Sequence, residues 1–177
     1  MRRILVVLGG LAAIIVATAV IGTLLPSGHV AKRSLVLAAP RDSVWAVITD
    51  FAAQPAWRAG LTKVERVSAG PEGEVWLEDG SEPLLLRTTD AVRPERLVRA
   101  IADSTLPFGG RWVYELAPLS SGGTRVTVTE EGEVYNPIFR VVSRFMDPSA
   151  TIRQYLTDLA ARFGEPPRIE VVPPESR

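Results

Sequence analysis

The sequence of 177 residues contains no cysteine and only one histidine, His29. The absence of cysteine excludes disulfides, thiolate catalysis and cysteine-ligated metal sites. His29 lies beside the apolar N-terminal run, has no obvious partner and is far from any positioned serine, which excludes Ser-His-Asp chemistry. No cluster of Asp and Glu has the spacing of a carboxylate metal site. We therefore expect neither a metal nor another cofactor.

The sequence also lacks an excess of charge of either sign. It has 20 Lys and Arg and 20 Asp and Glu, so the formal net charge is zero, and there is no basic run. Proteins that bind nucleic acid carry a basic patch to neutralise phosphates. We expect no nucleic-acid partner.

The N-terminus carries a long uncharged apolar run over residues 4–25, which follows two arginines and ends at Pro26. About 20 apolar residues are enough to cross the hydrocarbon core of a bilayer. The run predicts a transmembrane anchor, with a short linker, over residues 1–28. The alternative is a cleaved secretory signal, because residues 17–19 have the small-x-small form of a cleavage site. The apolar run continues past that site, which favours the anchor.

The charges that flank this run predict an orientation for the chain. Arg2 and Arg3 lie on one side, and Lys32 and Arg33 follow beyond the other end. Under the positive-inside rule this favours an N-terminus inside the cell. We expect a single-pass protein of the cell membrane whose domain lies outside the cytoplasm.

The remaining chain reads as one strand, two short helices, six strands and a long helix. The strands are expected near residues 35–37, 61–68, 74–78, 84–92, 96–103, 111–116 and 124–135, and the short helices at 41–49 and 51–57. Apolar residues at helical spacing predict one long amphipathic helix from Pro137 to Phe163, capped by Asn136 and either kinked or restarted near Pro148. Its apolar face is expected to be buried along both halves.

This order predicts an α+β fold over residues 29–164. A seven-stranded, curved antiparallel sheet would wrap around the long C-terminal helix, because that helix is the only element large enough to cover one face of the sheet. A cavity between the sheet and the helix is expected, and such pockets are the usual ligand sites. Residues 165–177 contain four prolines and predict a disordered tail.

Several segments of this domain resemble the SRPBCC or START-like superfamily, in its polyketide cyclase/dehydrase and lipid-transport branch. They are APRDSVWAVITDF at 39–51, PAW at 55–57, VE at 64–65, PFGGRW at 107–112, YEL at 114–116 and GTRVTVTEEG at 123–132. The resemblance covers roughly residues 30–163 and implies the helix-grip fold with a hydrophobic cavity for a lipid, sterol or polyketide-like ligand. The membrane segment in front departs from the usual members.

Strand alternation indicates which polar side chains point into the cavity. Glu130 shares the parity of the apolar Val126 and Val128, and the same rule turns Tyr114 and Arg99 inward. A carboxylate, a phenol and a guanidinium in an apolar pocket are candidates for ligand anchoring or for acid–base catalysis. In the competing interpretation Glu130 and Arg99 pair with each other, or a β-bulge turns one or both of them to water.

The residues expected to line the cavity come from the sheet, the second short helix and the long helix. They are Trp57, Leu86, Ile101, Phe108, Trp112, Tyr114, Val128, Glu130, Val142 and Phe145.

Three functions fit these features. The first is a membrane-anchored binder or carrier of a hydrophobic small molecule, held at the bilayer by residues 4–25. Arg140 and Arg144 of the long helix, near Phe139 and Phe145, would be placed to touch lipid headgroups. The second is a cyclase or dehydratase that uses Glu130, Tyr114 and Arg99. The third is a non-catalytic module that binds an unknown membrane protein. The absence of a catalytic motif favours binding over catalysis.

Overall fold

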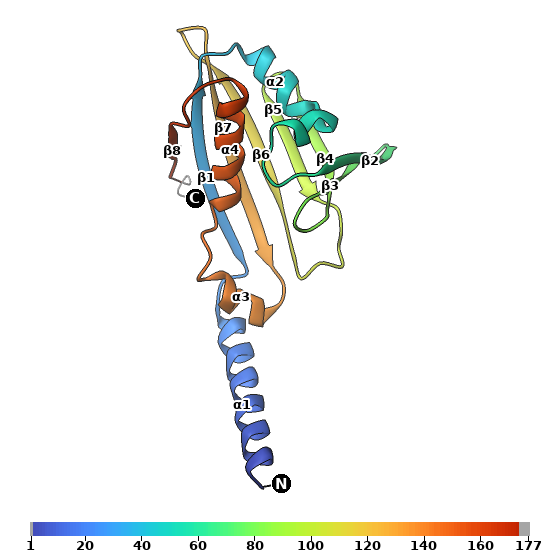
Figure 1. Cartoon of the computed structure of the whole chain (residues 1–177), viewed down its shortest axis with the longest axis vertical. Coiled ribbons are helices and arrows are strands. Elements are labelled where there is room, and N and C mark those ends of the chain that lie inside the picture. The colour runs from blue at the N-terminus through green and yellow to red at the C-terminus, as the bar shows by residue number, and fades with distance from the viewer. Residues whose placement is uncertain (1, 174–177) are drawn as a thin grey trace.

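The computed structural model describes residues 2–173, which form an N-terminal helix and one α+β domain. Helix α1 (Arg2–Leu24) projects from one end of the domain as a stalk (Figure 1). It is the one helix within residues 2–173 that is long and apolar enough to cross a membrane. The polar turn at Pro26 and Ser27 then leads directly into the first strand of the sheet.

All neighbouring strands of the sheet are antiparallel, in the order β2-β3-β4-β5-β6-β7-β1-β8. The strands are β1 (Gly28–Leu37), β2 (Lys63–Gly70), β3 (Gly73–Asp79), β4 (Leu84–Val92), β5 (Arg96–Ile101), β6 (Phe108–Pro118), β7 (Thr124–Val134) and β8 (Ile169–Val171). Irregularities between Arg66 and Ser68 and between Thr88 and Asp90 interrupt the regular pairing. Such bulges increase the local twist, which helps the sheet to curve.

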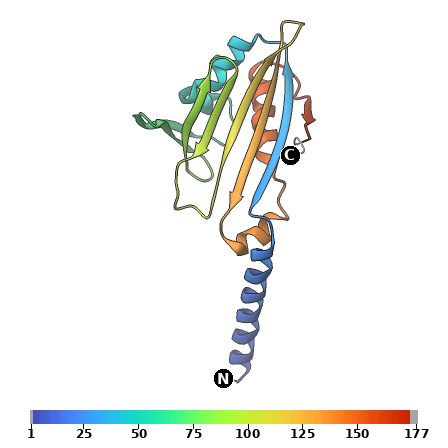
Figure 2. The same ribbon diagram turned by 180° about the vertical axis from the view of Figure 1, so that it is seen from behind.

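One face of the sheet is covered by helices, and Figure 2 shows the opposite face turned to the viewer. Helix α2 (Arg41–Thr49) and the 3₁₀ helix η1 (Phe51–Ala56) follow β1 at the end of the sheet away from α1. Helix α4 (Ala150–Arg162) lies across β1 and β7 (Figure 1). This arrangement is the α+β helix-grip architecture that the sequence predicts.

The hydrophobic core lies between α4, α2 and the sheet. Ile152, Leu156 and Leu159 of α4 pack against Leu35 of β1 and Val126 of β7, and each is at most 1% exposed. Burying one such side chain contributes about 1.5–3 kcal/mol. The inward alternation expected for β7 is therefore correct.

The long C-terminal helix predicted from the sequence is divided in its middle. The chain forms α3 (Pro137–Ser143) and α4, and residues 144–149 between them leave the helical path. Pro148 supplies no backbone donor, and Asp147 Oδ1 instead accepts hydrogen bonds from the Ser149 backbone N–H at 2.8 Å and from its hydroxyl at 2.7 Å. The second helix therefore restarts after the interruption, which is one of the two outcomes, a kink or a restart, that the sequence predicts there.

The expected burial of both halves of this helix fails. Helix α4 buries its apolar face, but α3 has no buried residue and packs beside the end of α1. Periodicity records which side chains share a face, and it does not record what lies opposite that face.

The predicted disordered tail is corrected in its first part. Residues 169–171 form β8, which pairs with Arg33, Ser34 and Leu35 of β1 and adds an eighth strand to the sheet. The prediction for residues 174–177 lies outside the described part of the chain.

Candidate functional site

A cavity of about 490 Å³ lies at the end of the domain from which α1 projects. The linker at residues 26–29 forms one side, α3 and the following turn form another, and the ends of β1, β6 and β7 complete it. Its apolar lining residues are Pro26, Ile101, Phe108, Trp112, Val134, Phe139, Met146 and Pro148. The volume falls within the range of about 300–1,000 Å³ that is usual for small-molecule sites.

Glu130 is the polar residue most firmly positioned in this cavity. Its side chain is 13% exposed, and Trp112 Nε1 donates a hydrogen bond of 2.8 Å to its Oε2. Trp112 lies directly opposite Glu130 in the pairing of β6 with β7, on the inward face. Cross-strand neighbours have Cβ atoms only about 5 Å apart, which accounts for this contact. The carboxylate keeps lone pairs free for a ligand, since it has roughly four acceptor sites.

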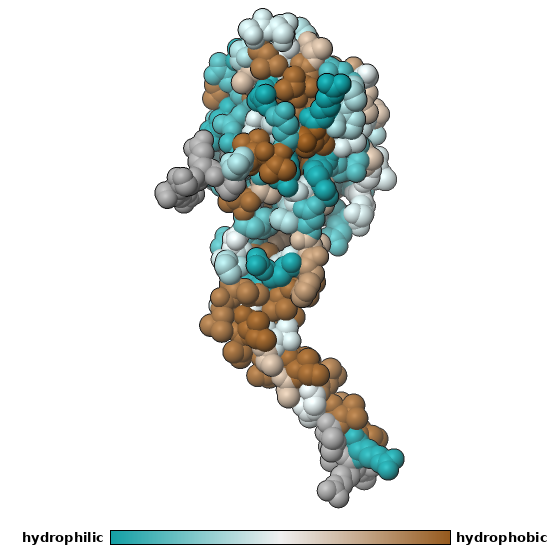
Figure 3. Space-filling model, turned by 90° about the vertical axis from the view of Figure 1, so that its left-hand side faces the viewer, coloured by the Kyte–Doolittle hydropathy of each residue, from teal (hydrophilic) through white to brown (hydrophobic). Residues whose placement is uncertain are grey.

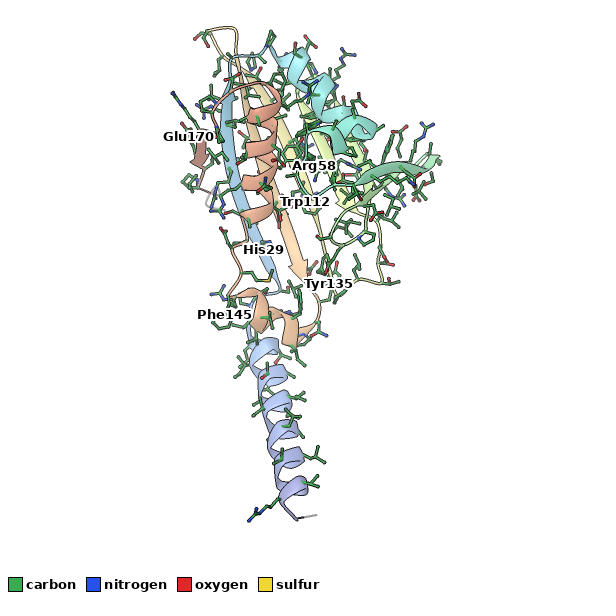
Figure 4. The ribbon with its side chains drawn as sticks, viewed as in Figure 1. His29, Arg58, Trp112, Tyr135, Phe145 and Glu170 are labelled. Carbon is green, nitrogen blue, oxygen red and sulfur yellow. The ribbon has the colours of Figure 1, made fainter. Side chains whose placement is uncertain are left out.

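His29 supplies the second partner of Glu130, a contact that was not predicted from the sequence. Its Nε2 lies 3.2 Å from Glu130 Oε1, and Figure 4 shows His29 near the α3 end of the domain, below Trp112. His29 pairs with Gly132 of β7, and a β-carbon at Gly132 would overlap the imidazole ring. The missing side chain at position 132 therefore leaves room for the ring.

The signal for His29 was present in the alternation of β1. His29 shares the parity of the buried Ala31, Leu35 and Leu37. We expected no partner because histidine at the edge of a membrane segment has no local one. Its actual partner lies 101 residues away in the chain.

Arg99 points inward as expected, but the structure does not bring it to Glu130. Its Nη1 donates to Glu78 Oε1 at 2.6 Å, and Arg58 Nη1 donates to Glu78 Oε2 at 2.7 Å. The Arg99 guanidinium also stacks 4.0 Å from the centre of the Phe51 ring. The competing interpretation, an Arg99–Glu130 pair, is also wrong, and neither β5 nor β7 turns its residue to water by a bulge.

Tyr114 belongs to the core and not to the cavity. It is 9% exposed, and its ring packs 5.2 Å from that of Tyr155. Burial raises the pKa of Tyr114 to about 12, and the charge of nearby Arg58 opposes this only in part. A phenol with this pKa holds its proton at neutral pH.

The ten residues expected to line the cavity are divided by the structure into three groups. Those in the cavity lining are Ile101, Phe108, Trp112 and Glu130. Those in or against the core are Trp57, Leu86, Tyr114 and Val128. Those exposed on the outside of α3 and the following turn are Val142 and Phe145. The last two are displaced because the long helix is divided.

The cavity is more acidic than its apolar walls suggest. Its lining carboxylates are Glu82, Glu130, Glu131, Glu133 and Asp147, and its lining arginines are Arg111 and Arg144. Arg111 is occupied by Glu131 at 2.7 Å. Within residues 2–173, no group of three or more His, Cys, Asp or Glu is placed to hold a metal ion. The arrangement suits an amphiphile that presents a hydrogen-bond donor or a positive charge to Glu130.

The comparison with protein families identifies one match. The family model described as polyketide cyclase/dehydrase and lipid transport matches residues 29–164. No curated protein matches the chain.

Solved structures with the same fold include a START superfamily protein and two enzymes. A START superfamily protein from Mycobacterium smegmatis has a TM-score of 0.62 at 14% identity, over 77% of this chain and 97% of its own. Norcoclaurine synthase from Thalictrum flavum, solved with a transition-state analogue, has a TM-score of 0.63 at 11% identity, over 77% and 94%. The Zhui aromatase/cyclase from Streptomyces has 0.57 at 15% identity, over 77% and 92%. At these identities the likeness describes the fold alone.

Proposed function

Because the chain belongs to the polyketide cyclase/dehydrase and lipid transport family, we propose that it binds or carries a hydrophobic small molecule at a membrane. The molecule occupies the cavity of about 490 Å³, with its polar end against Glu130. Helix α1 tethers the domain to the bilayer.

The observation that carries this proposal is the place of the cavity. The linker that joins α1 to β1, including Pro26 and His29, forms part of its lining. A helix that crosses the bilayer must end at its surface. The opening therefore lies where the tether leaves the membrane, and an apolar ligand has a short path between the lipid and the protein.

Glu130 determines the chemistry of the polar end. Among the described residues, His29 is the only basic side chain in contact with this carboxylate, and Trp112 donates a hydrogen bond to it. A ligand hydroxyl or amine that donates to Glu130 forms a charge-assisted hydrogen bond, which contributes about 1.5–3 kcal/mol. Loss of that bond weakens binding roughly ten- to hundredfold.

Mass spectrometry of the full chain, purified in lipid nanodiscs, tests the proposal. We expect a stoichiometric apolar molecule with wild type. The Ile101→Trp variant fills the cavity and should lose the molecule, whereas Val67→Trp, at an exposed site on β2, should retain it. Once the molecule is identified, Glu130→Gln should weaken its binding by the factor above, and the exposed Glu65→Gln should not. Retention of the molecule by Ile101→Trp at wild-type level would refute the proposal.

A second candidate is a cyclase- or dehydratase-type reaction on an apolar substrate. The contact of 3.2 Å between His29 and Glu130 inside the cavity supports it, because an imidazole beside a carboxylate is a common acid–base pair. Tyr114 and Arg99 are not part of this arrangement, since Arg99 pairs with Glu78 and Tyr114 is buried in the core against Tyr155. If the extracted molecule is converted, Glu130→Gln should abolish turnover. Unchanged product formation would exclude the enzyme.

The third candidate, a non-catalytic module for a membrane-protein partner, predicts an empty cavity. The same extract separates it from the carrier.

The orientation remains part of the proposal, with the N-terminus inside and the domain outside the cytoplasm. The natural absence of cysteine makes a direct test possible. A cysteine introduced at Val171, which is 71% exposed, should react with a membrane-impermeant thiol reagent on intact cells. Labelling only after the cells are opened would reverse the orientation.

A further inference from the structure

Residues 135–146, which we call the collar, contain the α3 helix and the turn after it. The collar carries a group of large apolar side chains on the surface. They are Tyr135 (49% exposed), Ile138 (39%), Phe139 (39%), Val142 (50%), Phe145 (89%) and Met146 (61%). A contiguous exposed apolar patch of this kind usually marks a contact surface. In Figure 4, Phe145 projects from the turn away from the domain.

The position of the collar along α1 is fixed by close packing of α3 against that helix. A β-carbon at Gly22 would overlap the backbone carbonyl of Pro137, so the start of α3 lies directly against the last turn of α1. Gly22 falls within the apolar span from Val7 to Leu24. The collar therefore begins beside the last turn of the apolar helix, before the chain enters the domain at β1.

The apolar surfaces of α1 and the collar are continuous. Val20, Ile21 and Leu24 at the end of α1 are all more than half exposed, and this end of α1 packs beside α3 of the collar. Figure 3 shows hydrophobic residues running from the stalk onto the lower end of the domain.

We propose that the collar lies in the headgroup layer of the bilayer, with its apolar side chains at the hydrocarbon boundary. This proposal rests on the membrane tether of the proposed function. Aromatic rings such as Tyr135 favour this interface, because one end of the ring is apolar and the other is wet. Arg144 is exposed on the same segment and reaches headgroup phosphates. Arg140 is instead held by the domain, since its Nε donates to the Val134 carbonyl at 2.8 Å.

The consequence for the cavity is a lateral entrance. Phe139, Ser143, Arg144 and Met146 belong to the collar and also line the cavity. A collar seated in the headgroups places this wall of the cavity against lipid. A hydrophobic ligand then enters from the leaflet without crossing water, and its polar end meets Glu130 on the opposite wall.

Single-cysteine labelling of the full chain in nanodiscs tests the position of the collar. The wild-type sequence has no cysteine, so one fluorophore reports from one site. The three sites are Phe145→Cys in the collar, Ile14→Cys in the middle of α1 (64% exposed) and Val67→Cys on β2 (58% exposed), which serves as the control for water. Each label is challenged with aqueous iodide and with lipids that carry a nitroxide high on the acyl chain.

We expect iodide to quench the label at 145 several-fold less than the label at 67, and the nitroxide lipid to quench it strongly. A label at 145 as open to iodide as that at 67, with the label at 14 protected, overturns the collar proposal and leaves the tether intact. Exposure of the label at 14 to iodide overturns both. Protection from iodide without quenching by lipid also overturns the proposal, because the collar then contacts protein.

Discussion

Glu78 and Glu130 are both carboxylates on the inner side of the sheet, yet we predict that changing each to glutamine affects a different property of the protein. Glu78 is 5% exposed and forms ion pairs with Arg99 at 2.6 Å and Arg58 at 2.7 Å. Glu130 lines the cavity and contacts one histidine and one tryptophan. The first should determine stability and the second should determine binding.

The magnitude for Glu78→Gln follows from the two cations that it leaves behind. The side chains of Arg99 and Arg58 are 3% and 19% exposed, so neither regains full hydration when the charge of Glu78 is removed. Removing one partner of a buried ion pair destabilises a protein by about 3–5 kcal/mol. The glutamine oxygen still accepts from one guanidinium, but the other loses its charged acceptor. We expect a loss within that range, which is a large part of the roughly 5–15 kcal/mol that stabilises a domain.

Urea denaturation followed by tryptophan fluorescence measures this loss. With a slope of about 2 kcal/mol/M, a loss of about 4 kcal/mol lowers the midpoint by about 2 M. Glu130→Gln should lower the stability by about 1 kcal/mol or less, since its amide oxygen still accepts from Trp112.

If Glu78→Gln does not fold, the double variant Glu78→Gln with Arg99→Met keeps the reasoning testable. It removes the most deeply buried cation with its partner and leaves Arg58, the more exposed one, so it should recover part of the stability. Equal stability of the Glu78→Gln and Glu130→Gln proteins would refute the distinction between the two carboxylates.

Three further predictions concern the pH dependence of stability, the role of His29 and the packing of α3 against α1. Burial raises the pKa of Tyr114 from 10 to about 12, so the stability that depends on this phenol is complete below pH 10 and falls as the pH rises to about 12; an unfolding midpoint that is flat across this range would contradict the shift. Gly132→Ala should displace the His29 ring and weaken ligand binding by about 1 kcal/mol, or about fivefold. His29→Ala should weaken binding by the same amount. The double variant should bind no worse than either single variant, because both changes remove the same contact. Gly22→Leu should separate the collar from α1 and make the label at Phe145→Cys more accessible to iodide. The control Gly9→Leu should leave that accessibility unchanged, because nothing lies within 4 Å of a β-carbon added at Gly9.

The inward face of each strand was predictable because alternation is local. Val126, Val128 and Glu130 share one face of β7 whatever their neighbours are, and the structure turns all three inward. Asn136 was predictable as the start of α3 for the same reason, since its side chain accepts from the next backbone N–H groups at 2.9 and 3.1 Å.

The partners of the inward polar residues were not predictable from alternation. Arg99 and Glu130 both point inward, but Arg99 meets Glu78 of β3 and Glu130 meets His29 of β1. Those choices depend on the order and register of strands that lie far apart in the chain. The position of Gly132 opposite His29 has the same origin.

The sequence by itself determined the α+β class, the apolar N-terminal helix and the inward set of each strand, because periodicity and capping are properties of neighbouring residues. Only the tertiary structure decided that α3 packs beside Gly22, that α3 buries none of its residues, and that the cavity opens at the α1 end. Each of these depends on which distant segment offers a matching surface, and one-dimensional spacing carries no information about that surface.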